Sequence, residues 1–148
     1  MSREILFRGK RLDTGGWVYG YYCKHIKRQV CPMGDELKPE DIAHLIINDA
    51  FADWNMPRSL QAYYVDPETV GQYTGVTDKG KNKMFEGDLY RSNGGHIFEI
   101  VYLKSEACFV GVPMKEPKSW VFLEDMLDMK KVGNKWDNPE LLEVLSDE

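Results

Sequence analysis

The stretch "VDPETVGQYTGVTDKGKNKMFEGDLY", residues 65–90, decides the fold of this chain. Extended segments alternate in it with turn signals. Pro67 fixes the backbone where one strand starts, and "TDKGKN" supplies the Asp and Gly of a tight turn. Three glycines can adopt turn or close-approach conformations that a Cβ resists: Gly75, Gly80 and Gly87. The pattern predicts strands joined by turns, with "KMFEGDLYR" as one strand, and indicates a structural signature rather than a reaction centre.

The same alternation of extended segments and turn signals continues on both sides of this stretch. "EILFRGK" predicts a first strand over residues 4–8, and "GGWVYGYYCKHIKRQVC" predicts a hairpin that turns near Lys24–His25. Downstream, Asn93–Gly94 is the strongest short hairpin signal, because both residues tolerate positive φ. "KKVGNKW" predicts the last strand. "NPELLEVL" predicts a short helix, with Asn138 as its N-cap and Pro139 at its first position.

One segment is ambiguous. In "PEDIAHLIINDAFADW", residues 39–54, apolar positions fit a helical stripe, but "AHLIIN" fits a short buried strand equally well. Asn, Asp and Pro interrupt the second half, which favours a strand followed by an ordered loop. A helix over this segment remains the alternative.

The period-two alternation and the regular turn signals predict a mostly-β fold. We expect a small, partly open β-barrel with an N-terminal β layer and a short C-terminal helix. The alternative is an α+β domain with a helix near residues 39–54. Residues 1–148 suit a single domain, and a division into an N-terminal β lobe (1–64) and a barrel lobe (65–148) stays open.

Charge, hydropathy and cysteine content limit the kinds of protein that this chain can be. The net charge is −5, which lowers the expectation of phosphate-backbone binding. The longest apolar run, "HLIIN", is far shorter than a membrane span, and the N-terminus lacks the apolar core of a signal peptide. We therefore expect a cytoplasmic protein whose three cysteines are reduced thiols.

Three blocks resemble one family. "REILFRGKRLDTGGWVYG", "VDPETVGQYTGVTDKGKNKMFEGDLY" and "VGNKWDNPELL" are similar in order and spacing to the YopX family, and they cover 55 of the 148 positions. The resemblance implies a mostly-β fold, an origin in a phage or prophage of a bacterial host, and a family whose molecular function is not established. It brings no catalytic residues to this chain.

Two acidic residues form the first candidate site. Glu86 and Asp88 lie two positions apart, so a strand would place both on one face. Such a pair suits acid–base chemistry or a divalent cation, as in a hydrolase. The alternative is structural: Asp88 binds the backbone of its turn and Glu86 is solvated, because Asp beside Gly is common turn chemistry.

Other catalytic and metal signals are weak. Cys23, His25 and Cys31 have the spacing C-x-H-x5-C without an obvious fourth ligand, so buried thiols on facing strands are favoured over a zinc site. No phosphate loop, dinucleotide fingerprint, metalloprotease helix or nucleophile elbow is present. We expect no metal, no cofactor and no enzymatic activity.

Two nucleic-acid hypotheses are weighed as well. The aromatic and basic hairpin 17–28 interleaves tyrosines with Lys24, Lys27 and Arg28, and stacking plus positive charge can hold single strands. Acidic residues near the C-terminus could instead imitate DNA phosphates for a host protein: Glu124, Asp125, Asp128, Glu140, Glu143, Asp147 and Glu148. Solvated charges explain both patterns more simply.

The leading expectation is a non-enzymatic accessory protein that binds a host or phage macromolecule or assembles with itself as a homo-oligomer. Nucleic acid as a partner is less favoured, and no membrane association is expected. The candidate partner-binding residues are Tyr73, Glu86, Asp88 and Trp136.

Overall fold

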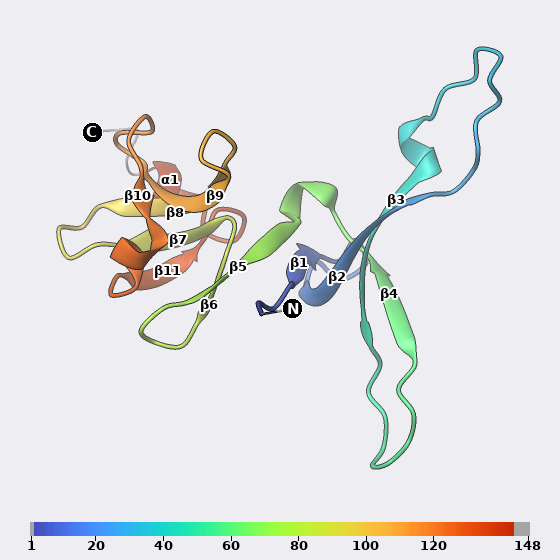
Figure 1. Ribbon diagram of the computed structural model, residues 1–148, viewed down its shortest axis with the longest axis horizontal. Helices are drawn as coiled ribbons and strands as arrows, with labels where there is room; N and C mark the ends of the chain where they lie inside the picture. Colours follow the sequence, from blue (N-terminus) through green and yellow to red (C-terminus); the bar gives the residue numbers. More distant parts are fainter. Residues whose placement is uncertain (1, 144–148) are drawn as a thin grey trace. The chain divides into compact units, whose positions relative to one another are not determined.

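The computed structural model describes residues 2–143 and confirms the mostly-β fold. Contacts divide the chain into two compact units. The N-terminal unit is Ile5–Gly71, and the C-terminal unit runs from Gln72 onward and includes the residues before Ile5. Figure 1 labels the strands of both units, each of which is described by itself below.

The N-terminal unit is an antiparallel sheet with the strand order β4-β3-β2-β1. Its strands are β1 (Phe7–Lys10), β2 (Trp17–Ile26), β3 (Ile42–Asp49) and β4 (Leu60–Tyr64). Short 3₁₀ helices, Pro39–Asp41 and Pro67–Thr69, precede β3 and follow β4. Gly9 allows close packing here, because a Cβ would lie 3.1 Å from the Val65 side chain.

One face of this sheet carries the core of the unit. Ile46 is fully buried and pairs with Tyr22 on β2 and Tyr63 on β4. Val18 and Val65 complete the buried cluster. Residues on neighbouring strand positions point to the other face. There Tyr19 and Tyr21 are exposed.

The predicted hairpin over residues 17–28 is wrong. Trp17–Ile26 is one continuous strand, and Lys24 and His25 lie inside it, paired with His44 and Ala43 of β3. Neither residue supplies turn chemistry, so the long ladder with β3 prevails over a local reversal. The chain leaves β2 through the connection 27–38 instead.

The ambiguous segment is a strand followed by a loop, as the sequence favours, and the helical alternative is wrong. Residues 42–49 form β3 between β2 and β4. The β-branched and apolar residues "IAHLII" suit this position with partners on both sides. Residues 50–59 form the loop to β4, which is closed by a hydrogen bond from the Ala50 N–H to the Ser59 carbonyl at 2.7 Å.

The C-terminal unit contains a five-stranded antiparallel sheet in the order β10-β9-β8-β7-β11. The strands are β7 (Asp88–Arg91), β8 (Ile97–Leu103), β9 (Cys108–Pro113), β10 (Val121–Phe122) and β11 (Lys130–Asn134). Before them come the paired strands β5 (Gly71–Thr77) and β6 (Lys83–Phe85). A 3₁₀ helix, Leu123–Met126, follows β10.

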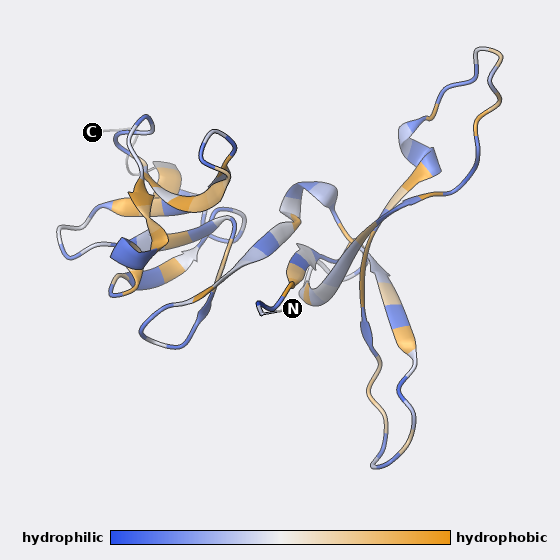
Figure 2. Cartoon of the chain, viewed as in Figure 1, coloured by the Kyte–Doolittle hydropathy of each residue, from blue (hydrophilic) through white to orange (hydrophobic). Residues whose placement is uncertain are grey.

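This unit has the larger core. Met84, Tyr90, Ile100, Leu123 and Met126 form its buried cluster, and Figure 2 shows hydrophobic residues gathered on β8 and β9. Within the described residues the sheet stays open between its edge strands β10 and β11, so no closed barrel forms.

On either side of β7, one turn prediction is confirmed and one strand prediction is wrong. Asn93–Gly94 does connect β7 to β8, where the Ser92 N–H donates to the His96 carbonyl at 2.9 Å. The single strand expected over "KMFEGDLYR" is wrong, because the chain turns at Glu86 and Gly87 and separates β6 from β7. Gly87 makes this turn possible with φ +87°.

The predicted C-terminal helix is present as α1 (Glu140–Glu143). The last two residues of the expected helix, 144 and 145, lie outside the described residues, as do Asp147 and Glu148 of the proposed acidic mimic and the side chain of Glu143.

Candidate functional site

The turn at Glu86 and Gly87 gathers the residues that the sequence singled out. Asp88 is fully buried, and its Oδ2 accepts a hydrogen bond from the Phe85 N–H at 2.9 Å. The Lys131 Nζ lies 3.5 Å from the same oxygen. The carboxylate therefore closes the turn between β6 and β7, which agrees with the structural alternative for Asp88.

Glu86 fixes β5 against this turn. Its Oε1 accepts from the Gln72 N–H at 3.0 Å, and the Glu86 N–H donates to the Gln72 carbonyl at 3.0 Å. Glu86 is thus half-buried and bonded, rather than simply solvated. The expected carboxylate pair on one strand face is wrong, because Glu86 lies in the turn and Asp88 begins the next strand.

Trp136 covers the turn from the other end of the chain. The Lys135 N–H donates to the Gly87 carbonyl at 3.0 Å, which brings the loop after β11 to this point. The Asn134 Oδ1 accepts from the N–H groups of Trp136 and Asp137 at 3.0 and 2.9 Å and so orders that loop. The Trp136 ring then lies against Gly87.

Tyr73 lies on β5 at the edge of the same cluster. Its ring centroid is 5.6 Å from that of Phe85, and only 7% of the residue is exposed. The Lys83 Nζ lies 5.4 Å from the Tyr73 ring. The structure thus brings Tyr73, Glu86 and Asp88 together with Trp136, and each has an internal packing or hydrogen-bonding role. Partner binding by these four residues stays a prediction.

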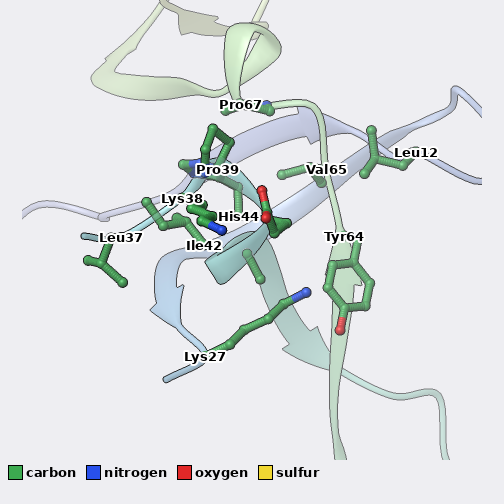
Figure 3. A pocket seen from close by; sticks show the side chains of 12 residues that line it. Leu12, Lys27, Leu37, Lys38, Pro39, Ile42, His44, Tyr64, Val65 and Pro67 are labelled. Carbon is green, nitrogen blue, oxygen red and sulfur yellow. The ribbon is translucent and has the colours of Figure 1, made fainter. Parts of the chain in front are cut away.

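The N-terminal unit contains a cavity that the sequence did not indicate. Its volume is about 650 Å³. Figure 3 shows it between the connection that precedes β3 and the segment around Val65. Apolar side chains line it: Leu12, Leu37, Pro39, Ile42, Val65 and Pro67. These residues come from three separated segments, so no local pattern could reveal the cavity.

Charged and polar groups surround this apolar lining. Lys27 and Lys38 bring two cations, Glu40 brings one carboxylate, and the Lys27 Nζ lies 5.9 Å from the Tyr64 ring (Figure 3). His44 also lines the cavity, and its Nδ1 is 2.6 Å from the Tyr22 hydroxyl. Burial raises the pKa of Tyr22, so this phenol stays protonated at neutral pH.

The loop 50–59, called the β3–β4 tip below, displays three large apolar side chains. Trp54 is 96% exposed, Phe51 93% and Met56 62%. A hydrogen bond from the Met56 N–H to the Asp53 carbonyl at 3.0 Å shapes its turn. The sequence "AFADWNMPRS" indicates a loop that contains aromatic residues. It does not indicate whether the aromatic side chains of that loop are buried or exposed.

The three residues considered as metal ligands, Cys23, His25 and Cys31, do not assemble into a site. Cys23 and His25 lie on β2, whereas Cys31 is exposed in the following connection, so the two cysteines do not lie on facing strands. Within residues 2–143, no three His, Cys, Asp or Glu side chains gather as metal ligands would. In the same range no helix combines the length and the apolar character that a membrane crossing requires.

The family model described as YopX protein matches residues 7–143, which is nearly the whole chain and includes both units. Among curated proteins, none matches this sequence.

Proposed function

The chain belongs to the YopX family, and we propose that it is a non-enzymatic phage or prophage protein that binds another protein through its N-terminal unit. It acts in the cytoplasm of the bacterial host. The partner is a host protein, a phage protein or a second copy of the chain.

The exposed apolar surface supports this proposal. Thirteen large hydrophobic side chains are exposed within the described residues, and eleven of them lie in Ile5–Gly71. Exposed apolar residues that occur singly need no explanation, but several of them close together on one segment, such as Phe51, Trp54 and Met56, are typical of an interaction surface. Phe51 and Trp54 are the strongest elements of it, because buried aromatic residues dominate the energy of protein interfaces.

The charge of the same unit favours a protein over a nucleic acid as the partner. Residues 5–71 contain eight Lys and Arg residues against nine Asp and Glu residues. A surface that binds phosphates needs an excess of cations. The aromatic side chains of this unit are therefore better suited to an apolar protein surface than to stacked bases.

Affinity capture from bacterial lysate tests the proposal. The tagged protein is compared with the variant Phe51→Ser/Trp54→Ser, each with and without nuclease. Phe122→Ser serves as the matched control, because Phe122 is also an exposed aromatic residue, at 52%, but belongs to the C-terminal unit. We expect a captured protein that survives nuclease, is lost with the double variant and is retained with the control.

Two outcomes contradict the proposal. Loss of all captured material on nuclease treatment would favour a nucleic-acid partner. Equal capture by the wild type and the double variant would place the binding surface outside the β3–β4 tip.

A further inference from the structure

We propose that the β3–β4 tip of one copy occupies the cavity of a second copy, so that the chain assembles head to tail. This inference rests on the proposed function, because it names the partner of the same surface. The occupants are Phe51, Trp54 and Met56, and the receiving residues are those that line the cavity beside Ile42 and Val65.

A single chain cannot make this contact with itself. The cavity is lined by Ile42 and His44, at the start of β3, whereas the tip follows Asp49 at its end. The eight residues of β3 span roughly 26 Å at about 3.3 Å per residue. The connections at the two ends of β3 leave in opposite directions (Figure 1). Each copy therefore offers both a cavity and an uncovered tip.

The two surfaces match in apolar character and in size. The tip exposes two aromatic side chains and a methionine, which lose unfavourable contact with water on burial. The cavity presents leucine, isoleucine, valine and proline side chains. Its volume of about 650 Å³ falls within the roughly 300–1,000 Å³ of sites that enclose a drug-sized group.

Charge complementarity favours a second copy as the occupant. Asp49 and Asp53 lie at or beside the tip with Arg58 as the cation, so this segment is net negative. The cavity carries Lys27 and Lys38 with Glu40 as the carboxylate, so it is net positive. Opposite potentials on the two sides steer association and fix its register.

The contact has a consequence for assembly. The tip and the cavity are different surfaces, so the interface is heterologous, and such interfaces produce rings or open chains instead of closed two-fold dimers. The average size of the assemblies should then increase with protein concentration.

Sedimentation velocity over a range of concentrations tests this with the full chain. The tip variant is Phe51→Ser/Trp54→Ser. The cavity variant is Leu12→Asp/Leu37→Asp, which places carboxylates where the acidic tip would dock. Both leucines are exposed, at 66% and 39%, so their replacement does not disturb the core. Met33→Asp is the matched control, because Met33 is 89% exposed on the same connection as Leu37 but does not line the cavity.

We expect the wild type and the control to self-associate. The tip variant should raise the dissociation constant by at least about thirtyfold, since aromatic hot spots typically contribute that much or more. The cavity variant should raise it as well, because its two new carboxylates repel the acidic tip. The decisive sample is an equimolar mixture of the two double variants. Each retains one intact half of the contact, so the mixture should form one-to-one complexes that do not grow further.

Three results would overturn the inference. They are a wild type that stays monomeric at high concentration, self-association that survives loss of the tip, and a mixture that fails to pair. If the wild type is monomeric while capture from lysate still depends on the tip, this inference fails and the proposed function stands. If neither self-association nor capture depends on the tip, both fail.

Discussion

The ring of Trp136 lies against the backbone of Gly87. A Cβ at position 87 would fall 2.4 Å from both Cζ3 and Cη2 of the indole, and the residue has φ +87°. Both facts require glycine, because real Cβ contacts are longer and an L side chain is strained at this φ. The Glu86–Gly87 turn, Asp88 and Trp136 are thus parts of one packed arrangement.

We predict that Gly87→Ala lowers the free energy of unfolding by about 3 kcal/mol. Backbone strain at positive φ and the overpacking against the indole each cost about 1–3 kcal/mol. Urea unfolding followed by tryptophan fluorescence measures the loss.

Gly95→Ala is the matched control for this prediction. Gly95 has φ +85°, but a Cβ added at this position would have no atom within 4 Å. Its replacement should cost only the strain, about 1 kcal/mol. Equal losses at both positions would show that the indole contact contributes nothing.

We predict that Asp88→Ala lowers the free energy of unfolding by about 2 kcal/mol, because the buried Phe85 N–H loses this acceptor. Asp88→Asn should cost less, since its amide oxygen can still accept that bond. Thermal unfolding measures both. Capture of the partner should be unchanged at temperatures where the variants are folded; loss of capture by a fully folded Asp88→Asn variant would instead support the partner-binding hypothesis for this residue.

Divalent cations should not stabilise the protein. Each candidate carboxylate already has partners, the Phe85 N–H and Lys131 for Asp88 and the Gln72 N–H for Glu86. We expect the midpoint of thermal unfolding to be the same with chelator and with millimolar magnesium or manganese. A reproducible rise with either cation would revive the hydrolase hypothesis built on Glu86 and Asp88.

Local chemistry explains which parts of the fold are predictable. The hairpin between β7 and β8 forms where Asn93–Gly94 predicts it, although the positive φ of the turn, +85°, is taken by the next residue, Gly95. The alternation along β2 likewise places Tyr19 and Tyr21 on one exposed face.

Long-range pairing explains what the sequence does not reveal. The polar pair Lys24 and His25 suggests a turn, but it continues a strand whose partners lie about twenty residues later. Gly87 is correctly predicted as a turn glycine. The single strand predicted over "KMFEGDLYR" is nevertheless wrong, because the turn at Gly87 divides it into β6 and β7. The cavity depends on three segments that meet only in the folded unit. The exposure of Phe51 and Trp54 contradicts the usual burial of aromatic residues, so hydropathy alone could not place them outside.

Removing the aromatic side chains from the β3–β4 tip should leave the fold intact. Trp54 and Phe51 are almost fully exposed, so Phe51→Ser/Trp54→Ser should change the free energy of unfolding by no more than about 0.5 kcal/mol. Urea unfolding at a low protein concentration checks this. A loss above about 1 kcal/mol would mean that these residues pack within the unit, and the capture experiment would then report folding instead of binding.

Asp78 should make the free energy of unfolding depend on pH. It is 7% exposed, its Oδ1 accepts from the Asn82 N–H at 2.9 Å, and its Oδ2 accepts from the Tyr90 hydroxyl at 3.0 Å. Burial alone would raise the pKa of Asp78, but the hydrogen bonds from Asn82 and Tyr90 outweigh it and hold the pKa below its ordinary value.

A pKa lowered by folding means that the unfolded chain binds the proton first as the pH falls. The stabilisation from Asp78 is therefore complete above the unfolded pKa of about 4 and is lost as the pH falls through the lower folded pKa. We predict that Asp78→Asn lowers the free energy of unfolding by about 2 kcal/mol at pH 7. The gap between the variant and the wild type should narrow below about pH 4. Urea unfolding at a series of pH values measures that gap, and a gap that stays constant from neutral to acid pH would show that the ionised carboxylate does not provide this stability.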